Sequence, residues 1–140
     1  MKPDTTIVRE LPLQGGGKAI FVKVNENNQQ YWVFPTADRV IAIKEQGWII
    51  KTAVMTVNGT DYLAKVDIEH PEHGTYVGYG SCGIKGDLDS AGIALKRAIC
   101  TTISLAGLLT DAIDELRKLN NRTLDSSKSD PLNESVLNKI

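Results

Sequence analysis

The sequence predicts an α+β fold in which an antiparallel β-sheet of hairpins packs against one long amphipathic α-helix, as a β-β-β-α core. Three observations predict this fold. Two β-rich runs flank Asn58-Gly59, a pair typical of hairpin turns. A third β-rich run contains Gly78 and Gly80 near its end. After it, residues 90–119 repeat apolar side chains at three- and four-residue steps, which is the period of an amphipathic helix.

Composition indicates a globular protein of ordinary size. The chain has 140 residues, 41% hydrophobic and 24% charged, which is enough for one domain with its own core. Its 16 Lys and Arg nearly balance 17 Asp and Glu, which argues against a nonspecific polycation but allows a local basic stripe. Two cysteines are too few for a disulfide framework, and no secretory signal opens the chain. No apolar run approaches the roughly 18–20 residues that span a membrane, so we expect a cytoplasmic protein without a membrane partner.

The first third of the chain predicts a hairpin and a short helix. Residues 1–17 contain several Pro and Gly and read as an irregular lead-in, to which residues 5–9 can add a short edge strand. Residues 18–24 and 29–34 read as strands joined by a polar turn. A short helix then precedes the central hairpin, over residues 37–46, with Thr36 as its cap and Gly47 as its end.

The central hairpin joins residues 48–57 to residues 60–70. A type I′ turn at Asn58-Gly59 would place Val57 opposite Thr60 and Ile49 opposite Ile68, giving one apolar face. The other face is half polar, as expected of a sheet with one side turned to water or a ligand. That face carries Thr52, Thr56, Asp61, Lys65 and Asp67 among Ile50, Val54 and Leu63.

The predicted long helix begins at Asp89 or Ser90, either of which can cap it. A rod of about 45 Å exceeds what a small sheet can cover, so we expect a kink near Gly107 or a protruding end. Polar residues after Asn120 indicate a linker and then a short terminal helix. The expected segments are thus a lead-in at 1–17, a single domain at 18–119, and a linker with a helix at 120–140. The apolar stripe of the long helix comprises Leu95, Ile99, Thr102, Ala106, Leu109, Ile113 and Leu116.

Two patterns that suggest a cofactor or a metal are weak. Gly78, Gly80 and Gly83 match GxGxxG, but a dinucleotide site needs a βαβ unit, and no strand is predicted after the helix. Two histidines lie with glutamates at residues 69–73, without a distant third ligand, so we read this stretch as a solvated loop. Since these are the only histidines, the sequence indicates no Ser/His/Asp or Cys/His catalytic arrangement. We expect no cofactor, no metal and no enzymatic activity.

A concentration of positive charge is more informative. Lys96 and Arg97 lie in a helical stretch with no acidic residue before Asp111, and Lys85 lies in the preceding loop. A helix N-terminus adds its own positive dipole, so phosphates would be attracted to this corner. Tyr79 could stack on unpaired bases. The alternatives are a solvated helix face for the cations and a packing role for the aromatic ring.

The segments Gly78-Tyr79-Gly80 and Leu95-Lys96-Arg97-Ala98, on a strand and on the helix that follows it, carry a resemblance. Residues 48–107 resemble the single-strand annealing proteins of the Rad-fifty-two family and its phage relatives. The chain departs from that pattern in a shorter spacer than in the eukaryotic proteins and in Thr101 near the position of a further helix cation. The resemblance implies a β-β-β-α core and a homo-oligomer such as a ring. The implied activity is binding and annealing of single-stranded DNA in homologous recombination or in phage or plasmid DNA repair, without nucleotide hydrolysis.

The resemblance assigns Lys96 and Arg97 to the DNA groove. The alternative function is a protein-interaction accessory module that acts through the end of the long helix and the tail at residues 132–140. The two can be separated by testing DNA binding directly. The predicted DNA-binding residues are Lys51, Lys65, Tyr79, Lys85, Lys96 and Arg97.

Overall fold

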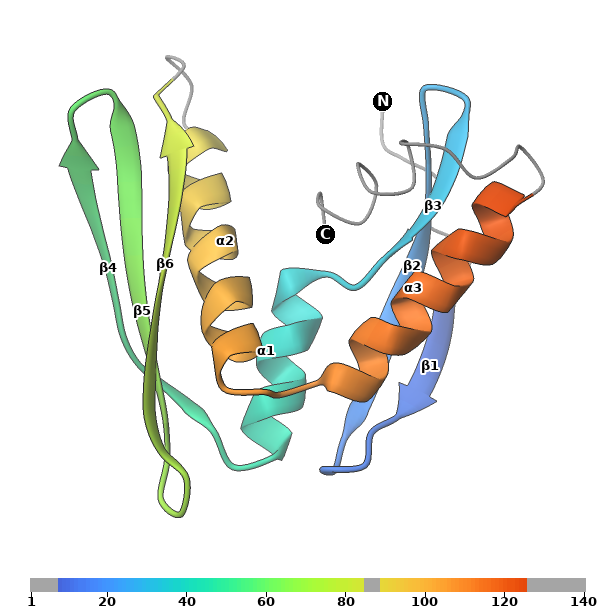
Figure 1. Ribbon diagram of the computed structural model, residues 1–140, viewed down its shortest axis with the longest axis horizontal. Helices are drawn as coiled ribbons and strands as arrows, with labels where there is room; N and C mark the ends of the chain where they lie inside the picture. The colour runs from blue at the N-terminus through green and yellow to red at the C-terminus, as the bar shows by residue number, and fades with distance from the viewer. Residues whose placement is uncertain (1–7, 85–88, 126–140) are drawn as a thin grey trace. The chain divides into compact units, whose positions relative to one another are not determined.

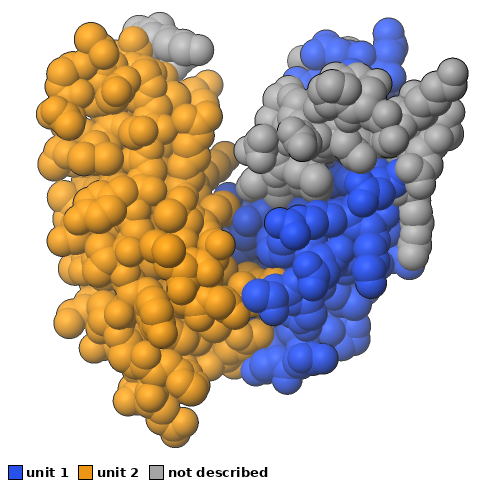
Figure 2. All heavy atoms as spheres, in the orientation of Figure 1, with its two compact units in different colours: residues 1–42, 110–140 blue, residues 43–109 orange. Residues whose placement is uncertain are grey.

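The computed structural model describes residues 8–84 and 89–125, which belong to two compact units (Figures 1 and 2). Unit 1 is drawn from chain segments 1–42 and 110–140, and unit 2 is residues 43–109. The described residues form three helices and two three-stranded antiparallel sheets, so the α+β class is confirmed. The arrangement of one sheet under one long helix is wrong. The segment 18–119, expected as one domain, is divided between the units.

The sheet of unit 1 has the order β1-β2-β3, with β1 at Val8–Pro12, β2 at Lys18–Glu26 and β3 at Gln29–Val33. Strands β2 and β3 form the hairpin expected from the sequence. Their turn is Asn27-Asn28, with φ of 52° and 64°, in the left-handed region that asparagine tolerates and a type I′ turn requires. Strand β1 lies within the stretch expected to be largely irregular.

The core of unit 1 lies between this sheet and helix α3, Thr110–Asp125, which packs against β3. Phe21 and Phe34 meet edge to face, with ring centroids 5.4 Å apart. Leu116 and Leu119 of α3 are buried. Helix α3 thus continues into the stretch from residue 120 that the sequence indicated as a linker, while the tail at 126–140 lies outside the described residues.

Helix α1, Thr36–Glu45, is the short helix expected before the central hairpin. The boundary between the units falls within it, after Ala42. At its start the buried Arg39 donates from Nε to the carbonyl oxygen of Phe34, at 2.9 Å. At its end, Gly47 has a φ of +93°, and the Trp48 N–H donates to the carbonyl of Ile43. The glycine predicted to end this helix therefore does so in the left-handed conformation.

The sheet of unit 2 has the order β4-β5-β6, with β4 at Ile49–Asn58, β5 at Asp61–His70 and β6 at Gly74–Gly83. The central hairpin is confirmed but its register is wrong. Asn58 pairs with Asp61, so Gly59-Thr60 forms the two-residue loop.

The φ of Gly59 is +64°, which suits the first central position of a type II′ turn, where glycine is required. Gly-Thr therefore takes the place that the sequence assigned to Asn-Gly. As a result, Val57 lies opposite Tyr62 instead of Thr60.

A bulge at Lys51 changes the register again. Ile50 pairs with Ile68, and Thr52 pairs with Asp67, which leaves Lys51 as the extra residue. One extra residue reverses the face on which the following side chains lie. Ile50 therefore lies on the same face as Ile68, instead of on the half-polar face where the sequence placed it. Ile49, which the sequence placed opposite Ile68, does not lie there.

The turn can be tested by substitution. Gly59→Ala should lower the free energy of unfolding by about 1–2 kcal/mol, because an L-residue is strained at this φ although no atom lies within 4 Å of the added Cβ. Asn58→Ala should change it by less than about 0.5 kcal/mol, since Asn58 is exposed and has no positive φ. Urea unfolding measures both. Equal losses would instead support an Asn-Gly turn.

The long helix predicted at 90–119 is two helices. Helix α2, Asp89–Leu105, ends at Gly107, whose φ is +71°. The Gly107 N–H donates to Ser104 O and the Leu108 N–H donates to Ile103 O, the bonding pattern of a Schellman cap. Gly107 is the break that the sequence indicated. Among the described residues no single helix is long and apolar enough to cross a membrane, and only α2 and α3 counted together reach that length and composition.

Candidate functional site

The two sequence segments that carry the resemblance contact each other in unit 2, where α2 packs on β5 and β6. A Cβ on Gly80 would lie 2.3 Å from the backbone nitrogen of Ala98 and 2.5 Å from the carbonyl oxygen of Ala94. A Cβ on Gly78 would lie 2.3 Å from Thr102 Oγ1. Because no side chain fits there, these glycines let the helix backbone approach the strand.

The face that α2 buries against the sheet consists of small residues. Ser90, Ala94, Ala98 and Thr102 recur every four positions and are all buried. The Thr102 hydroxyl lies 2.7 Å from Ala98 O and 3.2 Å from Val66 O, so its polar atom is satisfied inside the interface. Larger side chains of the expected stripe flank this face and are only half-buried, namely Leu95 and Ile99.

The helix cations Lys96 and Arg97 are both exposed, but they point to different sides. Arg97 Nη1 donates to the carbonyl oxygen of Ser81 at 2.8 Å, on the free edge of β6. Lys96 is about 100° further around the helix, on the side away from Ala94 and Ala98. The pair therefore extends from the edge of the sheet around α2.

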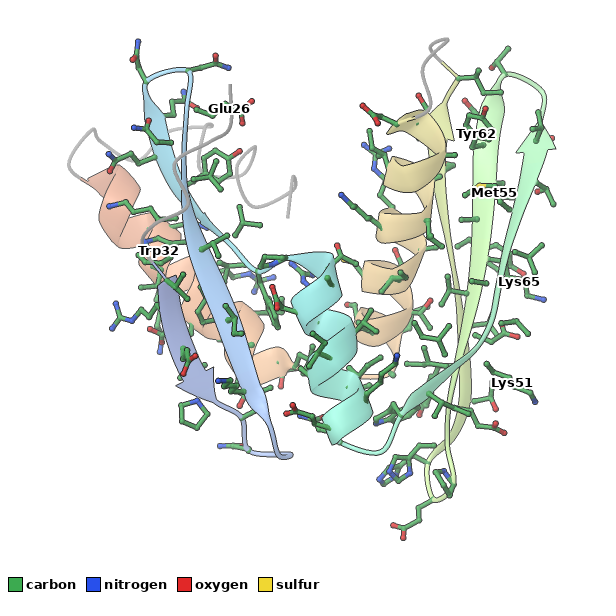
Figure 3. All side chains as sticks on the ribbon, turned by 180° about the vertical axis from the view of Figure 1, so that it is seen from behind. Glu26, Trp32, Lys51, Met55, Tyr62 and Lys65 are labelled. Carbon is green, nitrogen blue, oxygen red and sulfur yellow. The ribbon has the colours of Figure 1, made fainter. Side chains whose placement is uncertain are left out.

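The Lys65 and Tyr79 side chains lie on the face of this sheet that is opposite to the face covered by α2. The two residues are cross-strand partners on β5 and β6, and Tyr79 is 53% exposed. Figure 3 shows Lys51 and Lys65 on the side of the sheet away from α2. Acidic side chains share this region: Asp67 accepts a hydrogen bond from Thr52 Oγ1 at 2.8 Å, and Glu69 lies 3.9 Å from Lys51 Nζ.

Four of the six predicted DNA-binding residues thus lie on one continuous surface, and two do not. Strand β6 is an edge strand, and Ser81, which holds Arg97, is two residues from Tyr79 and on the same face. Lys51 lies on the opposite edge strand, β4, in its ion pair with Glu69, and Lys85 lies outside the described residues. This surface extends from the sheet face that α2 does not cover, over the free edge of β6, to the side of α2 that faces away from the sheet. We call it the β6-edge surface, made of Lys65, Tyr79, Arg97 and Lys96.

A cluster of rings closes one end of unit 2, and the sequence did not indicate it. The Trp48 ring lies 5.2 Å from His70, 6.1 Å from His73 and 5.8 Å from Tyr76, measured between centroids. Trp48 is 3% exposed and is therefore a packing group, whereas Tyr76 is 37% exposed and His73 is also exposed. Alternation along β6 could have shown that Tyr76 and Tyr79, three residues apart, face opposite sides. Within residues 8–84 and 89–125, no three His, Cys, Asp or Glu are grouped to hold a metal ion.

Comparison of the chain with models of known protein families finds no match, and comparison with curated proteins finds none either. The resemblance drawn from the sequence therefore rests on two short segments and on the unit they occupy. That unit is a three-stranded antiparallel sheet followed directly by a helix that packs on it.

Proposed function

We propose that this protein binds single-stranded DNA and anneals complementary strands without hydrolysing a nucleotide. The observation that carries the proposal is the contact between Gly80 and Ala98, which brings together the two segments on which the resemblance to the single-strand annealing proteins rests. These segments lie in a β-β-β-α unit, the element order that the resemblance implies. A role in DNA recombination or repair, and assembly into a homo-oligomer, belong to the same proposal.

The β6-edge surface offers the contacts that an unpaired strand needs. The exposed ring of Tyr79 can stack on a base, which is possible only where the base is not already stacked in a duplex. Lys65 next to it, and Arg97 and Lys96 beyond the strand edge, can contact successive phosphates. Arg97 keeps further N–H donors while one is held by Ser81 O.

The mechanism requires no acid or base. Cations hold the phosphates of one strand while its bases stay accessible. A complementary strand that collides with it forms base pairs, and the duplex leaves because its bases no longer stack on the protein. Since phosphate contacts release counterions, the affinity should fall steeply with salt concentration.

Alanine variants in the full chain test this surface. Lys96→Ala and Arg97→Ala should each weaken binding to all single-stranded sequences and lower the salt slope by about 0.7–1. Tyr79→Ala should weaken binding by about 1–3 kcal/mol with little change in slope, because stacking involves no counterion. Fluorescence anisotropy with labelled oligonucleotides of different sequence, across a salt series, measures both quantities.

The matched control is Lys118→Ala, which removes an exposed helical lysine from unit 1. It should leave affinity and slope unchanged. Annealing of two complementary oligonucleotides should be accelerated by the unaltered protein and not by the Lys96→Ala, Arg97→Ala double variant. An unchanged affinity of that double variant for single-stranded DNA would exclude the surface.

A further inference from the structure

Strand β4 is a long edge strand of unit 2. It has ten residues, and among the strands that the structure describes it pairs only with β5, which leaves its other side unpaired there. Large apolar side chains are exposed along it, with Val57 63% exposed and Val54 49% exposed. A long exposed apolar edge presents unpaired N–H and C=O groups, which is a template for another strand.

Other sheet edges among the described residues carry a feature that blocks pairing. On β3, the buried Asn120 side chain accepts from the Trp32 N–H at 2.7 Å and donates to the Trp32 carbonyl at 3.1 Å. On β6, the Arg97 guanidinium donates a hydrogen bond to the Ser81 carbonyl oxygen, which is then not free to pair with another strand. Strand β1 is only five residues long and ends in Pro12. Within residues 8–84 and 89–121, no side chain is seen to hydrogen-bond to the backbone of β4 in this way.

The turn next to β4 fixes which of its residues are free. Asn58 and Asp61 flank a two-residue loop, so they form a hydrogen-bonded pair, and alternate β4 residues back to Thr52 bond to β5. The residues between them therefore direct their N–H and C=O groups to the open edge. These residues are Ala53, Met55 and Val57.

We propose that β4 pairs antiparallel with β4 of a second copy of this chain, about a two-fold axis at Met55. The pairing would join the two three-stranded sheets into one of six strands. Met55 would lie opposite the partner's Met55, and Ala53 opposite the partner's Val57. Each such pair exchanges two backbone hydrogen bonds, which gives about six across the interface.

The β4 sequence is suited to pairing with itself. Residues 52–58 carry no charge, so two copies bring no like charges together. In this register the small Ala53 side chain meets the larger Val57, and Val54 meets Thr56 on the other face. Pairing of β4 with the free edge of β6 would compete with Arg97 at Ser81, and it would continue into a ring or a filament. The self-complementary edge favours the closed dimer.

The experiment measures the mass of the full chain, without DNA, by sedimentation or light scattering over a concentration series. The unaltered protein should form a dimer. Met55→Lys and Met55→Glu should each be monomeric, because like charges would face each other across the axis. An equimolar mixture of the two variants should restore the dimer, since the facing charges are then opposite. Met55 is 36% exposed, so we expect a charged side chain there to leave the fold intact. A circular dichroism spectrum equal to that of the unaltered protein would verify this for each variant.

Thr56→Lys is the matched control. It adds the same charge to the same strand, but its side chain lies opposite Leu63 on β5 and faces Val54 of the second copy, so the dimer should persist. The proposal would be overturned if the unaltered protein were monomeric, or if Met55→Lys remained a dimer. It would also be overturned if the mixture of the two variants stayed monomeric, or if the protein formed larger rings whose mass did not change on substitution of Met55. The readout is mass without DNA, so it is independent of whether the β6-edge surface binds DNA.

Discussion

Gly80→Ala should destabilise unit 2 by about 3 kcal/mol, at the upper end of what an inserted methyl group costs in a packed interior. The new Cβ would lie 2.3 Å from Ala98 N and 2.5 Å from Ala94 O. Both are backbone atoms of α2, which cannot move aside as a flexible side chain can. The helix must therefore shift off the strand. Urea unfolding followed by the fluorescence of the buried Trp48 measures the loss.

Two other glycines provide controls for this effect. A Cβ on Gly83, on the same strand, would have only an ordinary contact, 3.6 Å from Asp61 Oδ1, so Gly83→Ala should cost much less. Gly92 lies in α2 with open space around it, and Gly92→Ala should stabilise by about 0.5–1 kcal/mol through helix propensity. Equal losses at Gly80 and Gly83 would contradict the close approach of helix and strand.

Asn120→Ala should destabilise unit 1 by about 2–6 kcal/mol, because it leaves a buried N–H and a buried C=O of Trp32 without partners, at about 1–3 kcal/mol each. The amide of Asn120 satisfies both groups and is itself fully buried. Alanine can replace neither bond. Chemical unfolding measures the loss, and hydrogen exchange at the Trp32 amide should become faster.

The neighbouring Asn121 is the matched control for this substitution. It is exposed on the same helix, so Asn121→Ala should change the free energy of unfolding by less than about 0.5 kcal/mol. If the two alanine variants unfold at the same urea concentration, the Asn120 side chain does not protect the edge of β3.

Local signals predicted the elements well. The α+β class, both hairpins, the short helix and the break at Gly107 follow from turn residues and from periodicity over a few residues. Each depends on the conformation of one or two positions. Gly107, for example, ends α2 because it alone adopts a left-handed conformation at low cost where the Schellman bonds form.

Features that depend on distant residues were not predictable. Nothing local shows that the six strands divide into two sheets, or that Asn120 pairs with Trp32, 88 positions earlier. The predicted register of the central hairpin was wrong because two overlapping dipeptides, Asn-Gly and Gly-Thr, each allow a two-residue turn. The predicted apolar stripe includes the buried Thr102 but was wrong at Leu95 and Ile99, which are only half-buried. Hydrophobic periodicity favours such large residues, whereas two glycines on the strand select small ones.

For the candidate site, the sequence located cations but not their arrangement. Lys96 and Arg97 are neighbours in the chain, and only the bond to Ser81 shows that one of them lies at a sheet edge. Lys65 and Tyr79 are far apart in sequence and become partners through the pairing of β5 with β6. The β6-edge surface is thus a product of strand register, which the sequence did not determine.

The division of the chain has a consequence for synthesis on the ribosome. Unit 2 is one continuous segment, residues 43–109, whereas unit 1 is assembled from both sides of it. When residue 109 has emerged, every residue of unit 2 is present, but β1, β2 and β3 still lack the helix that covers their core. The edge of β3 stays open until Asn120 is made. We therefore expect the middle of the chain to fold first, and the nascent chain to be most prone to aggregate just before α3 appears.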